Sequence, residues 1–243
     1  YMTDVRTLFN AATDEFNDED KLETKISHYP FKKYKLKRHP EDEKRNLPPE
    51  QILIIAGISD EDLFLKRSIL ARDVFMLSFG LVGMNTIDLF ELLPSDYSNG
   101  RFTYKRKKTR RRRQDEALIS IKIEPELLPI IEKYKDKTGK RFFDFHTRYS
   151  DSHVFGSNVN KGLKKVAEKC QIKEELSTYY ARHSWATIAR NKCRISKSDV
   201  DECLNHVDQG SRMADYYIEK DWTLIDESNK KVIDFLKCVQ DKK

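Results

Sequence analysis

The sequence predicts a mainly α-helical protein with one small antiparallel β-sheet, which is an α+β class. Glycine (8 residues) and proline (7 residues) are scarce in a chain of 243 residues, and so few turn formers favour long helices over many short strands. Several segments repeat apolar residues at helical spacing, whereas one stretch carries a hairpin signal beside an alternating pattern. This length favours one large domain, or one domain with a fragment of another.

The first segment predicts an amphipathic helix over residues 1–17. Its apolar residues fall at helical spacing: Val5, Leu8, Phe9, Ala12 and Phe16. The residues that follow are polar and charged, and they predict an extended linker. We therefore expect three parts, which are the last helix of a truncated domain over 1–20, a linker over 21–46 and the main domain over 47–243.

Helices are expected through the first part of the main domain. Pro48 and Pro49 open a helix, because proline fits the first turn, where its missing N–H is not needed. A dense apolar segment predicts a longer helix over 60–79, which Gly80 interrupts. A short helix over 86–92 follows.

The small sheet is expected next along the chain. The Asn-Gly pair at 99–100 favours a two-residue hairpin turn. Strands are predicted over 101–108 and 117–123, and in the second of these isoleucine recurs at every other position. One face of this strand is therefore expected to be apolar.

Helices return after Pro125, which begins one that extends to about Lys135, and residues 140–157 are expected to be irregular. Further helices are predicted over five ranges: 158–170, 178–192, 196–205, 211–219 and 222–238. The last helix has an apolar stripe: Val232, Ile233, Phe235 and Leu236. Two interpretations of this stripe stay open, since it either docks on a neighbouring protomer or folds back on its own core.

Composition and motifs exclude several classes of function. The four cysteines form no CxxC pair and the six histidines form no HExxH pair, so we expect neither a metal site nor disulfides, in a reducing cytoplasm. The glycine-rich phosphate loops of ATP-binding and dinucleotide-binding proteins are missing, so we expect no cofactor. No run of about 18 apolar residues occurs, so we expect no membrane partner.

The strongest charge feature is the run over residues 105–113, in which eight of nine residues are Lys or Arg. Such a density repels itself unless an anion lies near. It is either a solvated loop tip or a β-ribbon that binds a nucleic-acid backbone through charge, without reading its sequence. We expect backbone contacts from six of these side chains: Lys105, Lys107, Arg110, Arg111, Arg112 and Arg113.

Three boxes near the C-terminus occur in a specific order and spacing. Residues 179–187 are Tyr-Tyr-Ala-Arg-His-Ser-Trp-Ala-Thr, residues 204–206 are Leu-Asn-His, and residues 215–218 are Asp-Tyr-Tyr-Ile. Together they resemble the second-arginine box, the Leu-Gly-His box and the nucleophile segment of the tyrosine recombinase (phage integrase) family, and in particular integrases of bacterial mobile elements. Residues 75–89 and 104–109 resemble that family's first-arginine region and the hairpin with its catalytic lysine.

This resemblance implies a function and a setting. It implies a site-specific recombinase that cuts and rejoins double-stranded DNA through a covalent 3′-phosphotyrosyl intermediate, for integration or excision of a mobile element. The truncated first part would then belong to a core-binding domain, and the main domain would be catalytic. Other protomers of the same recombinase would be partners on DNA, with a tetramer in synapsis, in the bacterial cytoplasm near the nucleoid.

The resemblance also assigns roles to single residues. Tyr217 is the expected nucleophile, and Tyr216 stays open as the alternative because the spacing to the preceding histidine is two residues longer than the commoner one. Arg182 is the second arginine, which holds the non-bridging phosphate oxygens in its planar fork. Lys108 is the expected general acid, and His206 binds the phosphate or assists proton transfer.

Two positions depart from the family pattern. Asn85 occupies the place of the first arginine, and Tyr179 occupies the place of the first histidine, where its hydroxyl can still donate one hydrogen bond. We hypothesise that Arg106, on the same strand face as Lys108, supplies the missing positive charge. Arg72 is a weaker candidate, because its helix is expected to be buried core.

Three other classes remain as alternatives. The first is a recombinase-fold DNA-binding module without cleavage activity, which the uncharged Asn85 allows. The second is a type IB topoisomerase, which shares the phosphotyrosyl chemistry and relaxes supercoils as a monomer. The third is a basic RNA-binding domain, which gives no special role to Tyr217.

Overall fold

The structure is a computed structural model of the chain. It describes residues 2–18, 21, 23–32, 34, 45–113, 115–206 and 221–242. The chain divides into two compact units, Tyr1–Glu43 and Lys44–Lys243, which are taken separately below. The functional roles expected for the corresponding segments stay predictions.

Unit 1 contains helix α1 (Met2–Phe16), which agrees with the helix predicted at the start of the chain. None of its residues is buried. The described first part of the predicted linker, up to residue 32, makes contacts with this helix and with Asn17 just after it. The Asn17 side chain accepts hydrogen bonds from the backbone of residues 25 and 26, at 2.9 and 2.8 Å. The rings of Tyr29 and Phe31 lie 5.8 and 5.7 Å from that of Phe9.

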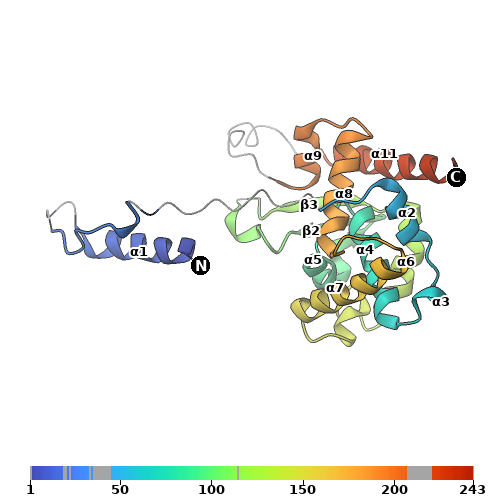
Figure 1. Ribbon diagram of the computed structural model, residues 1–243, viewed down its shortest axis with the longest axis horizontal. Coiled ribbons are helices and arrows are strands. Elements are labelled where there is room, and N and C mark those ends of the chain that lie inside the picture. Colours follow the sequence, from blue (N-terminus) through green and yellow to red (C-terminus); the bar gives the residue numbers. More distant parts are fainter. Residues whose placement is uncertain are drawn as a thin grey trace. The chain divides into compact units, whose positions relative to one another are not determined.

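The main helical elements of unit 2 are shown in Figure 1: α2 (Pro49–Gly57), α3 (Asp60–Leu63), α4 (Lys66–Gly80), α5 (Thr86–Glu91), α6 (Leu128–Tyr134), α7 (Ser152–Lys169), α8 (Thr178–Asn191), α9 (Lys197–Cys203) and α11 (Thr223–Gln240). The mainly helical class is thereby confirmed. The helix predicted over 60–79 is split, because Phe64 adopts a φ of 51° and ends α3. The segment expected to be irregular already contains the start of α7, where Asp151 caps the first turn. The helix predicted over 211–219 lies outside the described residues.

The sheet has three antiparallel strands in the order β1 (Tyr97–Ser98), β2 (Arg101–Lys105) and β3 (Leu118–Lys122). Asn99 and Gly100 both have positive φ, at 50° and 73°, as the predicted hairpin turn requires. Strand β2 ends at Lys105, three residues earlier than predicted. The reason is Asp88, whose carboxylate accepts the Lys107 backbone N–H at 2.9 Å and so directs that group away from β3.

This early end corrects the hypothesis that Arg106 and Lys108 share a strand face. The N–H groups of Thr109 and Arg110 donate back to the Arg106 carbonyl, at 3.3 and 3.0 Å, so the chain turns there. Lys108 lies exposed in the turn, whereas Arg106 is buried. Strand alternation therefore does not relate the two side chains.

Helix α4 is the centre of the unit 2 core. It packs against α7, α8 and α2, and its apolar side chains are almost completely buried. Gly162 on α7 allows the closest approach, because a Cβ at this position would lie 2.6 Å from the Ala71 Cβ and 2.6 Å from the Arg67 carbonyl oxygen. The helices of unit 2 that α4 contacts, among them α8 with Arg182, are thus packed around one buried helix.

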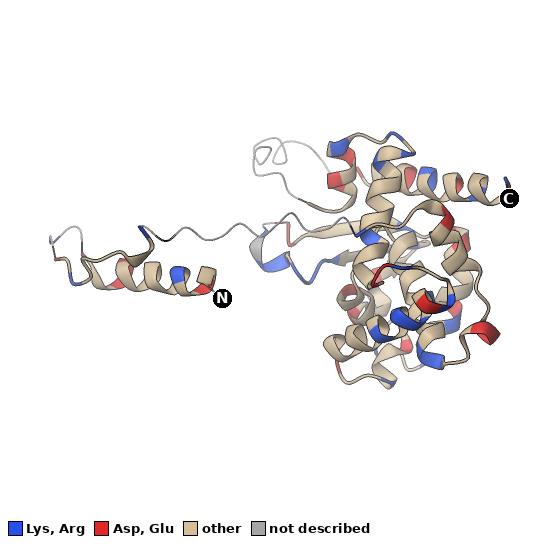
Figure 2. Ribbon diagram, in the orientation of Figure 1, with Lys and Arg blue, Asp and Glu red and all other residues tan. Residues whose placement is uncertain are grey.

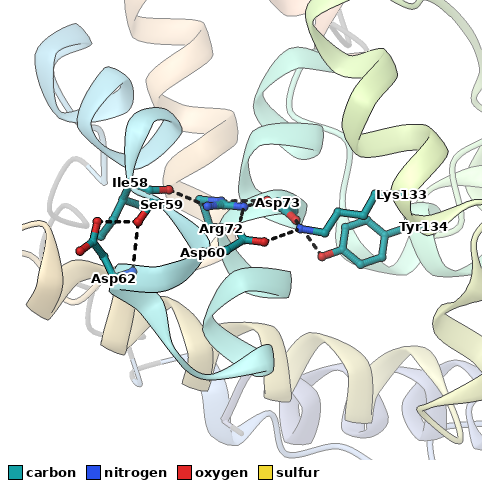
Figure 3. A network of polar contacts seen from close by, with 8 residues as sticks. All are labelled: Ile58, Ser59, Asp60, Asp62, Arg72, Asp73, Lys133 and Tyr134. Atoms are coloured by element: carbon teal, nitrogen blue, oxygen red, sulfur yellow. Dashed lines mark hydrogen bonds and ion pairs between the residues drawn. The ribbon is translucent and has the colours of Figure 1, made fainter.

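A buried ionic network joins α3, α4 and α6 (Figure 3). Asp73 is 2% exposed and accepts hydrogen bonds from Arg72 at 2.8 Å, from Lys133 at 2.8 Å and from the Tyr134 hydroxyl at 2.7 Å. Arg72 also donates to Asp60 at 2.5 Å. Because a buried carboxylate needs such partners, the network fixes these three helices relative to one another.

The apolar stripe of the last helix folds back on its own core. In α11 the side chains of Ile225, Val232, Ile233 and Leu236 are buried, and the helix packs against α2, α8 and α9. Its Asn229 accepts a hydrogen bond from the Trp185 indole at 2.9 Å and donates to the Gly80 carbonyl at 2.8 Å. Of the two interpretations left open by the sequence, this structure supports packing within the chain.

Two properties of the described residues bear on possible partners. None of the helices in this part of the chain is long and apolar enough to cross a membrane. No three His, Cys, Asp or Glu side chains among these residues gather as a metal site would need. All four cysteines are free thiols.

Candidate functional site

The predicted second arginine and the predicted late histidine lie side by side. Arg182 is on α8, and His206 follows α9 by three residues. The Arg182 Nη2 atom lies 3.2 Å from His206 Nε2, although the two residues are 24 positions apart in the chain. Arg182 also donates to the Gly83 carbonyl at 3.1 Å and to the Leu204 carbonyl. The fold therefore holds this guanidinium on two sides through backbone oxygens.

Gly83 permits this arrangement. Its φ is 71°, which favours glycine, and a Cβ there would lie 2.5 Å from Arg182 Cγ and 2.8 Å from its Cα. The turn after α4 thus touches the arginine directly. No local pattern in the sequence points to the contact of Gly83 with a residue 99 positions away.

Three arginine side chains donate hydrogen bonds to two neighbouring backbone carbonyl groups. We call the Leu204 and Asn205 carbonyl groups the carbonyl hub. Arg106 donates to both of them, at 3.1 and 3.3 Å, and Arg113 donates to the second at 3.1 Å. The basic hairpin is the run over residues 105–113 between β2 and β3, and Arg106 and Arg113 lie near its two ends. Together with Arg182 from α8, three guanidinium groups therefore meet at this short segment.

The charges at this point are not balanced locally. Burial and the nearby charge of Arg106 lower the pKa of Arg182 to about 10. Asp88 is the buried carboxylate beside these arginines, and burial raises its pKa, although the Lys107 N–H and the two arginine charges oppose that rise. One of its oxygens has no hydrogen-bond partner among the described residues. The guanidinium groups of Arg106 and Arg182 thus lie near one buried carboxylate, a local excess of buried positive charge that suits an anion.

His206 lies at the solvent side of these charged groups, with 51% of its side chain exposed. Burial and the Arg182 charge lower its pKa, and Asp201 opposes the shift. The shift favours the neutral form of the ring. Its Nδ1 lies 3.4 Å from Asp201, so a proton on Nδ1 leaves Nε2 free to accept from Arg182.

The cations of the basic hairpin divide into two groups. The turn between β2 and β3 is coloured blue in Figure 2 because of its many Lys and Arg residues. Lys105 and Lys107 form ion pairs with Glu116 and Glu91, and Arg113 is held by Asp115. The remaining expected contacts are Arg110, half-buried, Arg111, exposed, and Arg112, whose side chain lies outside the described part.

The other expected site residues described in the structure form no hydrogen bond with Arg182 or His206, although Tyr179 is close enough to affect the pKa of Arg182. Among the described residues, Lys108 forms no hydrogen bond with Arg182 or His206. Asn85 is the N-cap residue of α5 and makes no side-chain capping bond. Tyr179 is 48% exposed, with its ring 6.3 Å from that of His183.

Arg72, the weaker candidate for the missing charge, is bound by Asp60 and Asp73 in the network of Figure 3. Its role in unit 2 is therefore structural. The expected nucleophile Tyr217 and its alternative Tyr216 lie outside the described residues. Comparison of the chain with protein-family models, with curated proteins and with solved structures finds no match.

Proposed function

We propose that this chain carries the catalytic domain of a tyrosine-type site-specific recombinase, which cuts and rejoins double-stranded DNA through a covalent 3′-phosphotyrosyl intermediate. The observation that carries the proposal is the contact between Arg182 and His206, at 3.2 Å, with Arg106 held beside them at the carbonyl hub. These are residues that the sequence analysis singles out, and they come together beside one buried carboxylate, Asp88.

Cleavage of a phosphodiester by tyrosine needs positively charged groups close to the phosphate. Attack of a tyrosine oxygen on phosphorus places an additional negative charge on the non-bridging oxygens, and guanidinium groups stabilise it through paired N–H donors. Arg182 provides one such group. Arg106 provides the second positive charge in place of Asn85. The proximity of Arg106 to Arg182 supports this role, whereas the expectation that Arg106 and Lys108 share a strand face was wrong.

Proton transfer is shared between two groups in this proposal. His206, beside Arg182, accepts or returns a proton at the phosphate. Lys108 lies in the exposed turn of the hairpin, from which it protonates the leaving 5′ oxygen. The free 5′-hydroxyl of a second strand then reverses the first step, which conserves the bond energy without ATP.

DNA is the proposed partner because of the hairpin. Lys108 and Arg111 are exposed in the turn between β2 and β3, where such cations bind backbone phosphates with strong salt dependence. Recombination joins two DNA sites, so other protomers of the chain take part on DNA, with a tetramer in synapsis. The proposed setting is the bacterial cytoplasm at the nucleoid.

Covalent trapping tests this function. Duplexes from both flanks of the chain's own gene would carry a nick near the cleavage point, so that the short leaving fragment dissociates and the adduct accumulates. A denaturing gel then compares the wild type with Tyr217→Phe, Tyr216→Phe and Arg182→Gln. We expect an adduct that is lost in Tyr217→Phe and in Arg182→Gln and that is retained in Tyr216→Phe. Loss in Tyr216→Phe alone would move the nucleophile by one residue.

A second candidate is a DNA-binding module of the same kind that does not cleave. It is favoured by the uncharged Asn85, which leaves the site without the family's first arginine. This candidate predicts tight, salt-sensitive DNA binding and no adduct with any duplex. A type IB topoisomerase is distinguished by relaxation of supercoiled plasmid by the same preparation.

A further inference from the structure

The base of the basic hairpin is closed by an unusual stretch of backbone. Glu116 and Ala117 both have positive φ, at 51° and 55°, although neither is glycine. This conformation directs the Ala117 carbonyl toward two donors. It accepts the Arg106 backbone N–H at 3.1 Å and the Asn205 side-chain amide at 2.9 Å. The hairpin base is therefore bonded directly to the segment before His206.

Arg113 is bonded inward on both sides of its guanidinium. Its Nε and Nη2 atoms donate to the Asp115 carboxylate at 2.7 and 2.5 Å. Its Nη1 atom donates to the Asn205 side-chain oxygen at 2.7 Å and to the Asn205 carbonyl at 3.1 Å. The side chain is only 16% exposed. This geometry differs from that of a cation presented to solvent at a hairpin tip.

Asn205 uses both ends of its amide in these contacts. It is 8% exposed and has a φ of 52°, a conformation that glycine and asparagine tolerate best. Glycine would satisfy the backbone equally well, but it would supply neither the acceptor for Arg113 nor the donor for Ala117. The buried amide is therefore needed for these two contacts and not for the turn.

We propose that Asn205 and Arg113 form a latch that joins the base of the hairpin to the carbonyl hub and so positions Arg106 beside Arg182. Arg113 is then a positioning residue and not a phosphate contact. The latch acts on Arg106 because this side chain donates to the same two carbonyls that the Asn205 turn presents. Its effect on DNA cleavage rests on the proposed function, whereas its effect on the hairpin does not.

The test uses the full chain with Asn205→Gly, Arg113→Ala and the double variant. Asn99→Gly is the matched control, because Asn99 also has positive φ but lies exposed in the β1–β2 turn. Two quantities are measured. The first is hydrogen exchange of the hairpin amides, above all that of Arg106. The second is the rate of adduct formation at saturating DNA, set beside the equilibrium DNA affinity.

If the latch exists, hydrogen exchange of the Arg106 amide should be about tenfold faster in both single variants than in the wild type, which is the effect of losing one buried hydrogen bond. They slow adduct formation at saturation by about tenfold or more and change DNA affinity by less than about twofold. The double variant is no worse than the slower single variant, since both single variants remove the shared side-chain contact between Arg113 and Asn205. Asn99→Gly leaves both quantities unchanged.

Other outcomes overturn the latch. Additive effects of the two substitutions in the double variant would contradict it. A weaker DNA affinity of Arg113→Ala, with a slope of log K against log salt lower by about 0.9, would also contradict it, because that change marks a lost phosphate contact. If Asn205→Gly does not fold, Arg113→Ala alone decides, because it leaves the buried asparagine in place. If the wild type forms no adduct, the proposed function fails. The latch fails separately if hydrogen exchange of the hairpin amides is unchanged in both single variants.

Discussion

At the scale of single residues, the site depends on the close approach of Gly83 to Arg182. We predict that Gly83→Ala destabilises unit 2 by about 2–4 kcal/mol, because the new methyl group meets the Arg182 side chain while the backbone is held at positive φ. Thermal unfolding measures this change. Adduct formation should fall as well, since the displaced guanidinium loses its contact with the Gly83 carbonyl.

Gly139→Ala is the matched control for this prediction. Gly139 has a φ of 72°, almost the same as that of Gly83, but an added Cβ meets nothing within 4 Å. It should therefore cost only the backbone strain, about 1 kcal/mol. Equal losses in the two variants would show that the contact with Arg182 contributes nothing.

The titration of His206 gives a second prediction at this scale. Burial and Arg182 lower its pKa, so the ring should titrate below its ordinary value of 6.5. Asp201→Asn should lower the midpoint further, because it removes the carboxylate that opposes the shift, and Arg182→Gln should raise it. Chemical shifts of the His206 ring across a pH series measure all three. A midpoint that Arg182→Gln leaves unmoved would contradict the contact.

The sign of the stability effect follows from the same shift. The folded protein holds the His206 proton less tightly than the unfolded chain does, so the unfolded chain binds more protons just below pH 6.5. Stability should therefore fall as the pH drops from 6.5 through the folded-state pKa. Above 6.5 the contribution of this group should be constant. Denaturant unfolding of the wild type and His206→Gln at several pH values checks this slope.

At the scale of secondary-structure elements, helices α4 and α7 approach each other closely at Gly162. We predict that Gly162→Ala destabilises the protein by about 1–3 kcal/mol, because its methyl group would lie 2.6 Å from both Ala71 Cβ and the Arg67 carbonyl. Denaturant unfolding measures the loss. Gly57→Ala at the end of α2 is the control, and it should be neutral or stabilising because nothing lies within 4 Å.

Local pattern predicted most helices and the hairpin, because periodicity and turn residues act within a few positions. It failed where a distant side chain competes for a backbone group. Strand β2 is shortened by Asp88, which takes the Lys107 N–H. Helix α4 begins after a break at Phe64 that its apolar pattern does not mark.

The candidate site divides in the same way. Arg182 and His206 were named from motifs, and the structure brings them into contact. Three further contacts join segments about 20 to 100 positions apart. They are made by Gly83 with Arg182, by Asp88 with the Lys107 N–H and by the Asn205 amide with Ala117. Such partners depend on how the elements pack, so no single sequence pattern contains them.

At the scale of the whole molecule, the apolar core belongs to unit 2. Within the described residues, the buried core cluster extends from Leu47 to Leu236, and α1 contributes none of it. We predict that removing residues 1–43 changes the unfolding temperature by less than about 2 °C, since 1 kcal/mol corresponds to about 2–4 °C at this size. Scanning calorimetry of both lengths measures the difference. A larger fall would mean that unit 1 stabilises the core.

The distribution of charge over the molecule determines how its affinity for DNA should depend on salt. The net charge is only +6, so a general attraction is weak and the hairpin cations should dominate. Arg111 is exposed and has no ion-pair partner among the described residues, whereas Lys107 is paired with Glu91.

We predict that Arg111→Ala lowers the slope of log K against log salt by about 0.9, the value for one lost phosphate contact. Lys107→Ala should lower it by clearly less, because Glu91 already neutralises this lysine and a phosphate would have to replace that partner. Titration of a fluorescent duplex at several salt concentrations gives both slopes, with Lys173→Ala as the control for net charge. Equal slopes for Arg111→Ala and Lys173→Ala would show that DNA responds to total charge and not to the hairpin.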